Sequence, residues 1–177
     1  MLTERLIQAQ LWRENHSVCH RIMPNFSPAS WWECDLLLLR KTLLTHEFEI
    51  KLTVADYRKD FIKADSTGIV QKHELLRTKH ERCPNRFSFV LPATVRSKIV
   101  LPDYAGIVLA EWRNGRVVLT TERNAPLLHS TRSAAKLAQT MERAAYYRFW
   151  NERESQAKES RKDKQRLLDS LTEAGMV

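Results

Sequence analysis

Two neighbouring stretches of strand character constrain the fold of this chain most strongly. Residues 34–39 read Cys-Asp-Leu-Leu-Leu-Leu, an apolar run with the length of a buried strand. Residues 46–52 follow after a brief turn and alternate charged with apolar side chains. A period of two places the two kinds of side chain on opposite faces of a strand. We expect the two stretches to pair as a hairpin inside a folded core.

One carboxylate lies within the apolar run. Asp35 interrupts a strand that otherwise belongs in a core, and a buried carboxylate needs a partner. On the next stretch Glu49 and Lys51 are two residues apart, so their side chains leave the same face. Pairing of the two strands would bring two carboxylates and an ammonium together at one edge of the sheet. Glu47 shares that face one step farther away.

This combination of side chains suits a divalent metal ion. Carboxylate oxygens are ligands that Mg²⁺ accepts while it keeps several waters, so Asp35 and Glu49 are the predicted ligands of Mg²⁺ or Mn²⁺. Such an ion can polarise a phosphate and activate a water, while Lys51 steadies that water or the charge that develops on phosphorus. The matching reaction is phosphodiester hydrolysis. A charged hairpin can also produce this spacing as a cross-strand ion pair on a solvated face.

The remaining pattern predicts an α/β fold with helices and strands in mixed order. Thr53 offers a helix-capping hydroxyl, and Asp56 stands three residues later, where it favours capping over metal binding. Asn114-Gly115 is typical of a hairpin turn. We expect helices over 2–14, 53–64, 71–80 and from 131 onward, strands over 34–39, 46–52, 87–91, 106–112 and 116–121, and a loop over 15–32.

The charge is distributed unevenly along the 177 residues. The formal net charge is +8, yet residues 151–177 hold six basic and six acidic groups, so the excess lies in the preceding body. We therefore expect a domain over 1–150 and a charged helical tail over 151–177. Residues 51–98 hold eleven Lys or Arg and five Asp or Glu, which favours binding of a polyanion such as DNA, although an ordinary solvated surface has the same composition. The candidate phosphate contacts are Lys59, Lys63, Lys72, Arg77, Lys79 and Arg82.

Several classes of protein are disfavoured. The longest uninterrupted apolar run covers only residues 36–39, far short of the roughly 18 residues that cross a bilayer. The first residues carry charges and lack the apolar core of a signal peptide. The three cysteines are widely separated and odd in number, which argues against a disulfide framework. We expect a cytoplasmic protein with no membrane partner.

Several blocks of the sequence, in order, resemble phage and bacterial members of the PD-(D/E)xK nuclease superfamily. The blocks are 32–37, 46–51, 55–61, 79–80, 83–87, 90–92, 102–106 and 125–129, so the resemblance spans about residues 25–129.

The resemblance implies a restriction-endonuclease-like mixed central sheet flanked by helices, here with a long C-terminal helix. It implies that Asp35, Glu49 and Lys51 form the catalytic triad. Many members add an acid from the first helix, for which Glu4 and Glu14 are candidates, and Glu33 is a further candidate. This chain departs from the name-giving motif because Cys34 precedes Asp35 where the motif has proline.

The sequence therefore predicts a Mg²⁺-dependent deoxyribonuclease, such as a phage or mobile element would use in DNA processing or defence. If a phage encodes it, we expect it in the host cytoplasm. One alternative is a catalytically inactive nucleic-acid-binding or regulatory protein on the same fold. Another is an interaction adaptor that works through the C-terminal helix, which could also hold a protein partner or a second copy of the chain.

Overall fold

The computed structural model describes residues 2–29, 31–62, 68, 71–133 and 135–173. The chain divides into two compact units, Met1–Met141 and Glu142–Val177, and each is considered by itself. The expected boundary at residue 150 falls within the long C-terminal helix, Ala135–Glu173.

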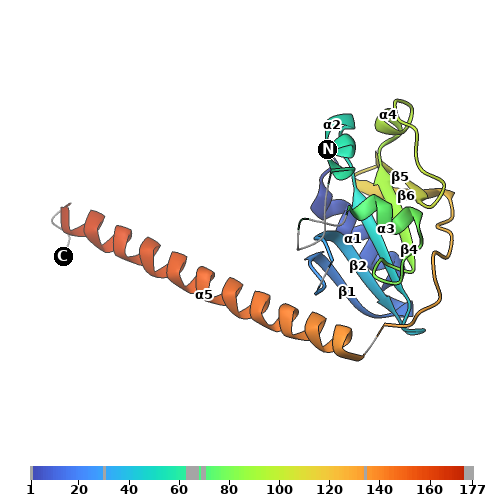
Figure 1. Ribbon diagram of the computed structural model, residues 1–177. Helices are drawn as coiled ribbons and strands as arrows, with labels where there is room; N and C mark the ends of the chain where they lie inside the picture. The colour runs from blue at the N-terminus through green and yellow to red at the C-terminus, as the bar shows by residue number, and fades with distance from the viewer. Residues whose placement is uncertain (1, 30, 63–67, 69–70, 134, 174–177) are drawn as a thin grey trace. The chain divides into compact units, whose positions relative to one another are not determined.

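Unit 1 is built on a six-stranded mixed sheet with the spatial order β1-β2-β3-β4-β5-β6 (Figure 1). The first three strands run antiparallel, β3, β4 and β5 run parallel, and β6 returns antiparallel to β5. The expected α/β class and the β2–β3 hairpin are both confirmed. The strands are β1 (Cys19–Phe26), β2 (Cys34–Arg40), β3 (Thr45–Ile50), β4 (Arg86–Leu91), β5 (Gly106–Arg113) and β6 (Arg116–Arg123).

Helices cover both faces of this sheet. The amphipathic α1 buries Ile7 and Leu11 against one face, and α2 and α3 lie over the other, as Figure 1 shows. The Thr53 hydroxyl accepts a hydrogen bond from the Asp56 amide, which confirms Thr53 as the N-cap of α2. The helices are α1 (Glu4–Asn15), the 3-10 turn η1 (His16–Val18), α2 (Val54–Asp60), α3 (Lys72–Arg77), α4 (Ala93–Arg96) and α5 (Ala135–Glu173).

The prediction of a loop over residues 15–32 was wrong. Cys19–Phe26 forms β1, which pairs with β2. Pro24 and the polar residues around it favoured a loop, but β1 is an edge strand, and an edge strand tolerates a proline because one side of its backbone needs no partner.

Two predicted helices end earlier than expected. α2 ends at Asp60 and α3 at Arg77, so Lys79 and Arg82 follow α3 instead of lying on it. Lys79 has φ of 54°, in the left-handed region, where a helix cannot continue. Residues 63–64, the expected end of the first of these helices, lie outside the described residues.

The two faces of β3 have opposite character, although all six of its residues are buried. Phe48 and Ile50 belong to an apolar cluster with α1 and the neighbouring strands. Glu47 and Glu49 point to the other face, under α2 and α3, and Lys51 follows directly after the strand. The alternation in the sequence thus becomes a division between an apolar layer and a charged layer.

Unit 2 consists of α5 residues from Glu142 onward. Its described side chains are mostly exposed, and about half of them are charged. Four aromatic side chains on it are more than half exposed: Tyr146, Tyr147, Phe149 and Trp150. Among the described residues, the helices include none whose length and apolar character would suit a bilayer crossing.

Candidate functional site

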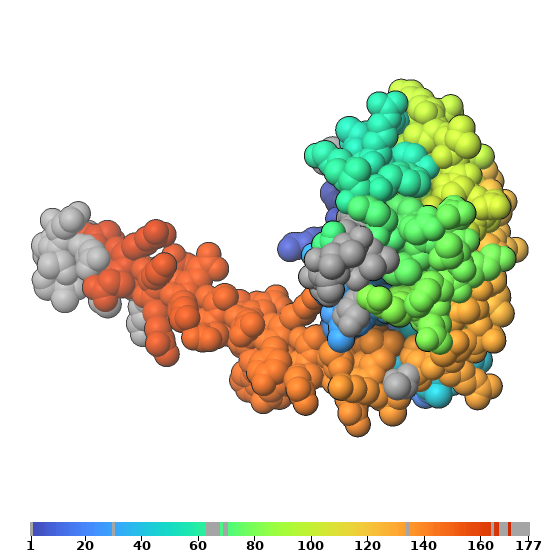
Figure 2. Space-filling model, viewed as in Figure 1, coloured from blue at the N-terminus to red at the C-terminus, as the bar shows by residue number. Residues whose placement is uncertain are grey.

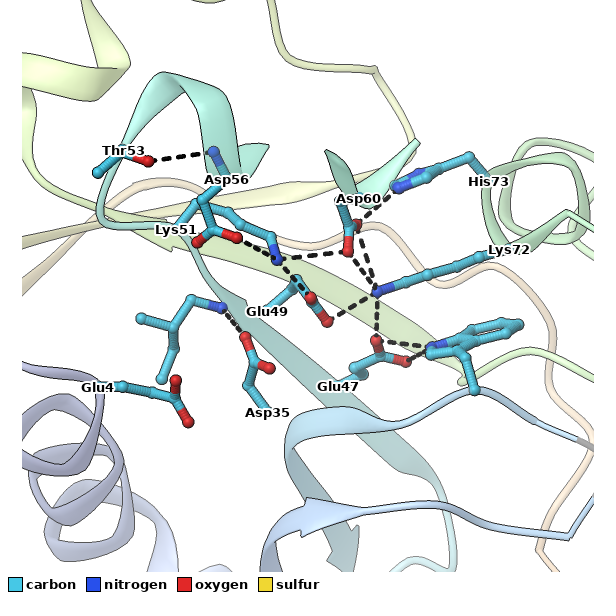
Figure 3. Close-up of polar contacts among 12 residues, drawn as sticks. Glu4, Asp35, Glu47, Glu49, Lys51, Thr53, Asp56, Asp60, Lys72 and His73 are labelled. Atoms are coloured by element: carbon cyan, nitrogen blue, oxygen red, sulfur yellow. Dashed lines mark hydrogen bonds and ion pairs between the residues drawn. The ribbon is translucent and has the colours of Figure 1, made fainter. Parts of the chain in front are cut away.

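Glu49 and Lys51, the two predicted site residues at the end of β3, are in direct contact. Lys51 Nζ lies 2.6 Å from Glu49 Oε1, and both side chains are at least 96% buried (Figure 3). Their spacing of two residues on an extended segment puts both on the same face, and α2 excludes water from above them. The pair is therefore a buried ion pair, not one on a solvated surface.

Asp35 reaches this pair through the backbone of β3. Its Oδ2 accepts a hydrogen bond of 2.7 Å from the amide of Ile50, the residue between Glu49 and Lys51. The pairing of Leu36 with Phe48 explains the placement, because Asp35 is then level with Glu49 on the adjacent strand. The hairpin thus gathers the three predicted residues at one end of β2 and β3.

Of the three candidate additional acids, the structure brings Glu4 to this group. The side-chain amide of Gln8 donates to Glu4 Oε1 at 2.9 Å and to the backbone carbonyl of Asp35 at 2.8 Å. Figure 3 shows Glu4 beside Asp35 at the end of α1. Glu14 is exposed at the other end of α1, and Glu33 is exposed before β2, so neither joins Asp35.

A buried lysine occupies the centre of the charged layer. Lys72 Nζ lies 2.9 Å from Glu47 Oε1, 2.7 Å from Glu49 Oε2 and 3.3 Å from Asp60 Oδ2, and its side chain is fully buried. Burial alone would lower the pKa of Lys72, but the three carboxylates together raise it well above its usual range. The expectation that Lys72 contacts phosphate at the surface is corrected, because its ammonium is enclosed by carboxylates.

Asp60 and His73 extend this network away from β3. His73 lies between two partners, with Nε2 2.7 Å from Asp60 Oδ2 and Nδ1 2.7 Å from the Tyr104 hydroxyl. Burial opposes ionisation of Asp60, yet Lys72 and the hydrogen bond with His73 hold the pKa of Asp60 far below its usual range. Burial lowers the pKa of His73, so we assign a neutral ring at pH 7. Asp60 is therefore an anion that fixes both Lys72 and Lys51.

Glu47 is the acid of this layer that lies farthest from Asp35 along the strand. The indole N–H of Trp32 lies 2.9 Å from Glu47 Oε1 and 3.0 Å from its Oε2. Burial raises the pKa of Glu47, although Lys72 opposes this shift. Glu47 thus anchors Lys72 and Trp32, and its contacts are those of a structural group.

Reasoning from sequence missed the network that holds Glu49. Its members Asp60, Lys72 and His73 come from helices, and Lys72 was expected at the surface. One signal could have revealed them: Lys72 shares a helical face with Leu75 and Leu76, which are buried. A lysine on the apolar face of a short helix needs a buried anion as a partner.

Of the other predicted phosphate contacts, Lys59 lies on α2, Arg77 ends α3, and Lys79 and Arg82 follow α3. Lys59 and Lys79 are exposed, and Arg82 is half-buried. Arg77 is exposed and lies 2.6 Å from Glu74. Figure 2 shows the side of unit 1 that these segments form. Lys63 lies outside the described residues.

The donor set around Asp35 and Glu49 fits a hard cation. Among the described residues, no group of three or more His, Cys, Asp or Glu side chains is arranged to hold a metal. Mg²⁺, however, usually binds one or two carboxylates and completes its shell with waters and phosphate oxygens. Lys51 and Lys72 each contact one oxygen of Glu49, so a cation at Glu49 would compete with an ammonium.

Comparison with known proteins identifies a fold and no activity. No protein-family model matches the chain, and no curated protein matches it. One solved structure is similar, described as "SPO1766 protein of unknown function from Silicibacter pomeroyi". It shares 17% sequence identity with a TM-score of 0.61, over 86% of this chain and 92% of that chain. At this identity the similarity concerns the fold alone.

Proposed function

We propose that this protein is a Mg²⁺- or Mn²⁺-dependent nuclease that hydrolyses phosphodiester bonds in DNA. The observation that carries the proposal is the position of Asp35, whose carboxylate binds the amide between Glu49 and Lys51. Two acids and one ammonium from adjacent strands thereby converge at one end of the hairpin, and α1 adds Glu4. In this proposal Asp35 and Glu49 hold the metal.

Each residue then has a distinct task. When bound, the metal ion would polarise a phosphate oxygen and lower the pKa of a water. Lys51 is placed to stabilise negative charge that develops on phosphorus or on the attacking water. The Ile50 amide fixes one oxygen of Asp35, and Lys72 fixes one oxygen of Glu49. The surrounding network thus orients the proposed ligands instead of taking part in the chemistry.

The topology supports a restriction-endonuclease-like core. In unit 1 an antiparallel unit of three strands follows α1, and β4 joins parallel to β3 after α2 and α3. The acids stand on the second and third strands of that unit. This arrangement agrees with what the resemblance to the PD-(D/E)xK superfamily implies for residues 25–129.

The surface supports a polyanionic substrate. Lys59 is exposed on α2 and Lys79 is exposed just after α3, the two helices that contribute side chains to the charged layer. Contacts of this kind bind phosphates regardless of base sequence and weaken as salt concentration rises. We therefore propose DNA cleavage without strong sequence preference.

A nuclease assay tests the proposal. Plasmid and linear DNA are incubated with the purified full chain in Mg²⁺, in Mn²⁺ and in EDTA. We expect cleavage with either metal, none in EDTA, and losses of at least about 100-fold for Asp35→Asn, Glu49→Gln and Lys51→Met. Glu33→Gln is the matched control, because Glu33 is exposed and outside the group. Wild-type rates in all three site variants would refute the assigned site.

One observation favours binding without catalysis as the second candidate. Each oxygen of Glu49 already contacts an ammonium group, so a metal ion would compete with Lys51 and Lys72 for this carboxylate. If the protein is a non-catalytic binder, Mg²⁺ and Mn²⁺ will leave its melting temperature unchanged while DNA still binds in a salt-dependent way. A metal-dependent rise in melting temperature that Asp35→Asn abolishes would favour the nuclease.

A further inference from the structure

A polar cavity lies on the face of the sheet opposite the charged layer, under the C-terminal half of α1. Its volume is about 260 Å³, and its wall includes Glu14, Arg40, His46, Thr121 and Arg123. His46 stands on the face of β3 that carries Phe48, away from Glu49. The cavity is therefore separate from the candidate nuclease site.

Two residues of the cavity wall each hold a buried polar atom that lacks a hydrogen-bond partner within the described part of the chain: Arg40 Nε and His46 Nδ1. His46 is 93% buried. A buried N–H without an acceptor destabilises the fold, so a ligand that supplies acceptors would be bound favourably. Because Leu38 pairs with His46, Arg40 is a diagonal neighbour of His46 on the same face, and one small ligand can reach both.

The other nitrogen of His46 indicates which kind of atom the ligand presents. His46 Nε2 lies 2.9 Å from the hydroxyl of Ser88. Ser88 is held closely, because a Cβ on Gly106 would lie only 2.5 Å from Ser88 Oγ. If the hydroxyl donates to Nε2, Nδ1 carries the proton of the neutral ring. Arg40 and His46 then offer two N–H donors to one acceptor group.

The charges around the cavity favour an anion. Arg40 and Arg123 line it and Arg86 lies beside His46 on β4, whereas Glu14 is the acidic residue of the wall. Burial and the positive charges of Arg40 and Arg86 lower the pKa of His46 to about 3, so the ring itself stays neutral at pH 7. Two carbonyls in the C-terminal half of α1 already accept hydrogen bonds, since Asn15 Nδ2 donates to Leu11 O and the His16 amide donates to Trp12 O.

We propose that this cavity binds a small oxyanion, a phosphate or a carboxylate group, through Arg40 Nε and His46 Nδ1. A volume near 260 Å³ admits a free anion or a metabolite of a few heavy atoms and excludes a nucleic-acid strand. The site does not depend on the nuclease proposal, because it uses the other face of β3 and none of the acids proposed to hold metal.

Calorimetric titration tests the site in the full chain, with inorganic phosphate, citrate and acetate as separate ligands in a non-coordinating buffer. We expect saturable binding of at least one of them, weakened at least tenfold in Arg40→Gln. Tight phosphate binding would identify a phosphate site, and preference for citrate or acetate a carboxylate site. Arg116→Gln is the matched control, because Arg116 is an exposed arginine on β6 outside the wall, and it should bind as the wild type does.

The tautomer of His46 provides a second readout that does not depend on how well a variant folds. In ¹⁵N-labelled wild-type protein, we expect Nδ1 to carry the proton and its resonance to shift on addition of the ligand. Absence of saturable binding by all three anions would overturn the proposal, because a water molecule would then suffice to satisfy both donors. Undiminished binding in Arg40→Gln, or a proton on Nε2 instead of Nδ1, would also overturn it.

Discussion

The two faces of β3 are built in different ways from alternate residues of one strand. On one face Phe48 and Ile50 pack in an apolar cluster with α1. On the other, Glu47 and Glu49 are neutralised by ammonium groups from outside the strand. The stabilisation that comes from buried apolar surface does not depend on pH. A buried charge, in contrast, destabilises the fold when any of its partners is removed. The charged face is therefore stable only when all of its carboxylates and ammonium groups are present, and the same contacts hold Glu49 in place.

The largest effect is expected from removal of the central cation. Lys72→Met removes the ammonium that contacts Glu47, Glu49 and Asp60, and leaves Lys51 in contact with Glu49 and Asp60. We expect a loss of about 3–5 kcal/mol in the free energy of unfolding at pH 7. Urea unfolding measures this loss. Lys59→Met, which removes an exposed lysine, should change stability by less than about 0.5 kcal/mol. Equal effects of the two substitutions would contradict a buried network.

His46 is the titratable side chain on the apolar face of β3, and we expect it to make the stability of the protein depend on pH. The pKa of His46 is about 3 in the folded state, below the value near 6.5 in the unfolded chain. The unfolded state therefore binds more protons between these values, and stability falls as pH falls from about 6.5 towards 3. From pH 6.5 to 5 the loss should approach about 2 kcal/mol.

Urea unfolding as a function of pH checks the role of His46. His46→Gln should flatten the fall between pH 6.5 and 5, leaving a smaller one from His73, whose pKa is also lowered. Exposed His20→Gln is the control and should follow the wild type. If His46→Gln leaves the profile unaltered, the buried neutral ring is not the source of the pH dependence.

A small substitution in the apolar cluster tests whether the stability of that face is independent of pH. Ile50→Val removes one buried methylene without altering any charge, and we expect a loss of about 0.5–1.5 kcal/mol. The loss should be the same at pH 5 and pH 8, because no ionisable group is affected. A difference between the two pH values would show that the cluster is coupled to the charged face.

The sequence revealed the β2–β3 hairpin because period-two alternation and an apolar run are local signals. It also predicted that pairing of these strands would bring Asp35, Glu49 and Lys51 together at one edge of the sheet, whereas the level position of Asp35 and Glu49 follows from the register. It did not reveal β1, because Pro24 favours a loop in a prediction from sequence. The segment forms a strand through its pairing with β2, which is not a local signal. The role of Lys72 was hidden for a similar reason. Lysine is almost always exposed, and its three carboxylate partners come from distant residues.

The most direct test of the central claim is the anomalous scattering of Mn²⁺ soaked into crystals of the wild-type protein. We expect a peak about 2.0–2.2 Å from carboxylate oxygens of both Asp35 and Glu49, with Lys51 Nζ displaced from Glu49 Oε1. The same soak of Asp35→Asn crystals should show no peak there. A wild-type map without density between the two carboxylates, at Mn²⁺ concentrations that support cleavage of DNA, would contradict the account.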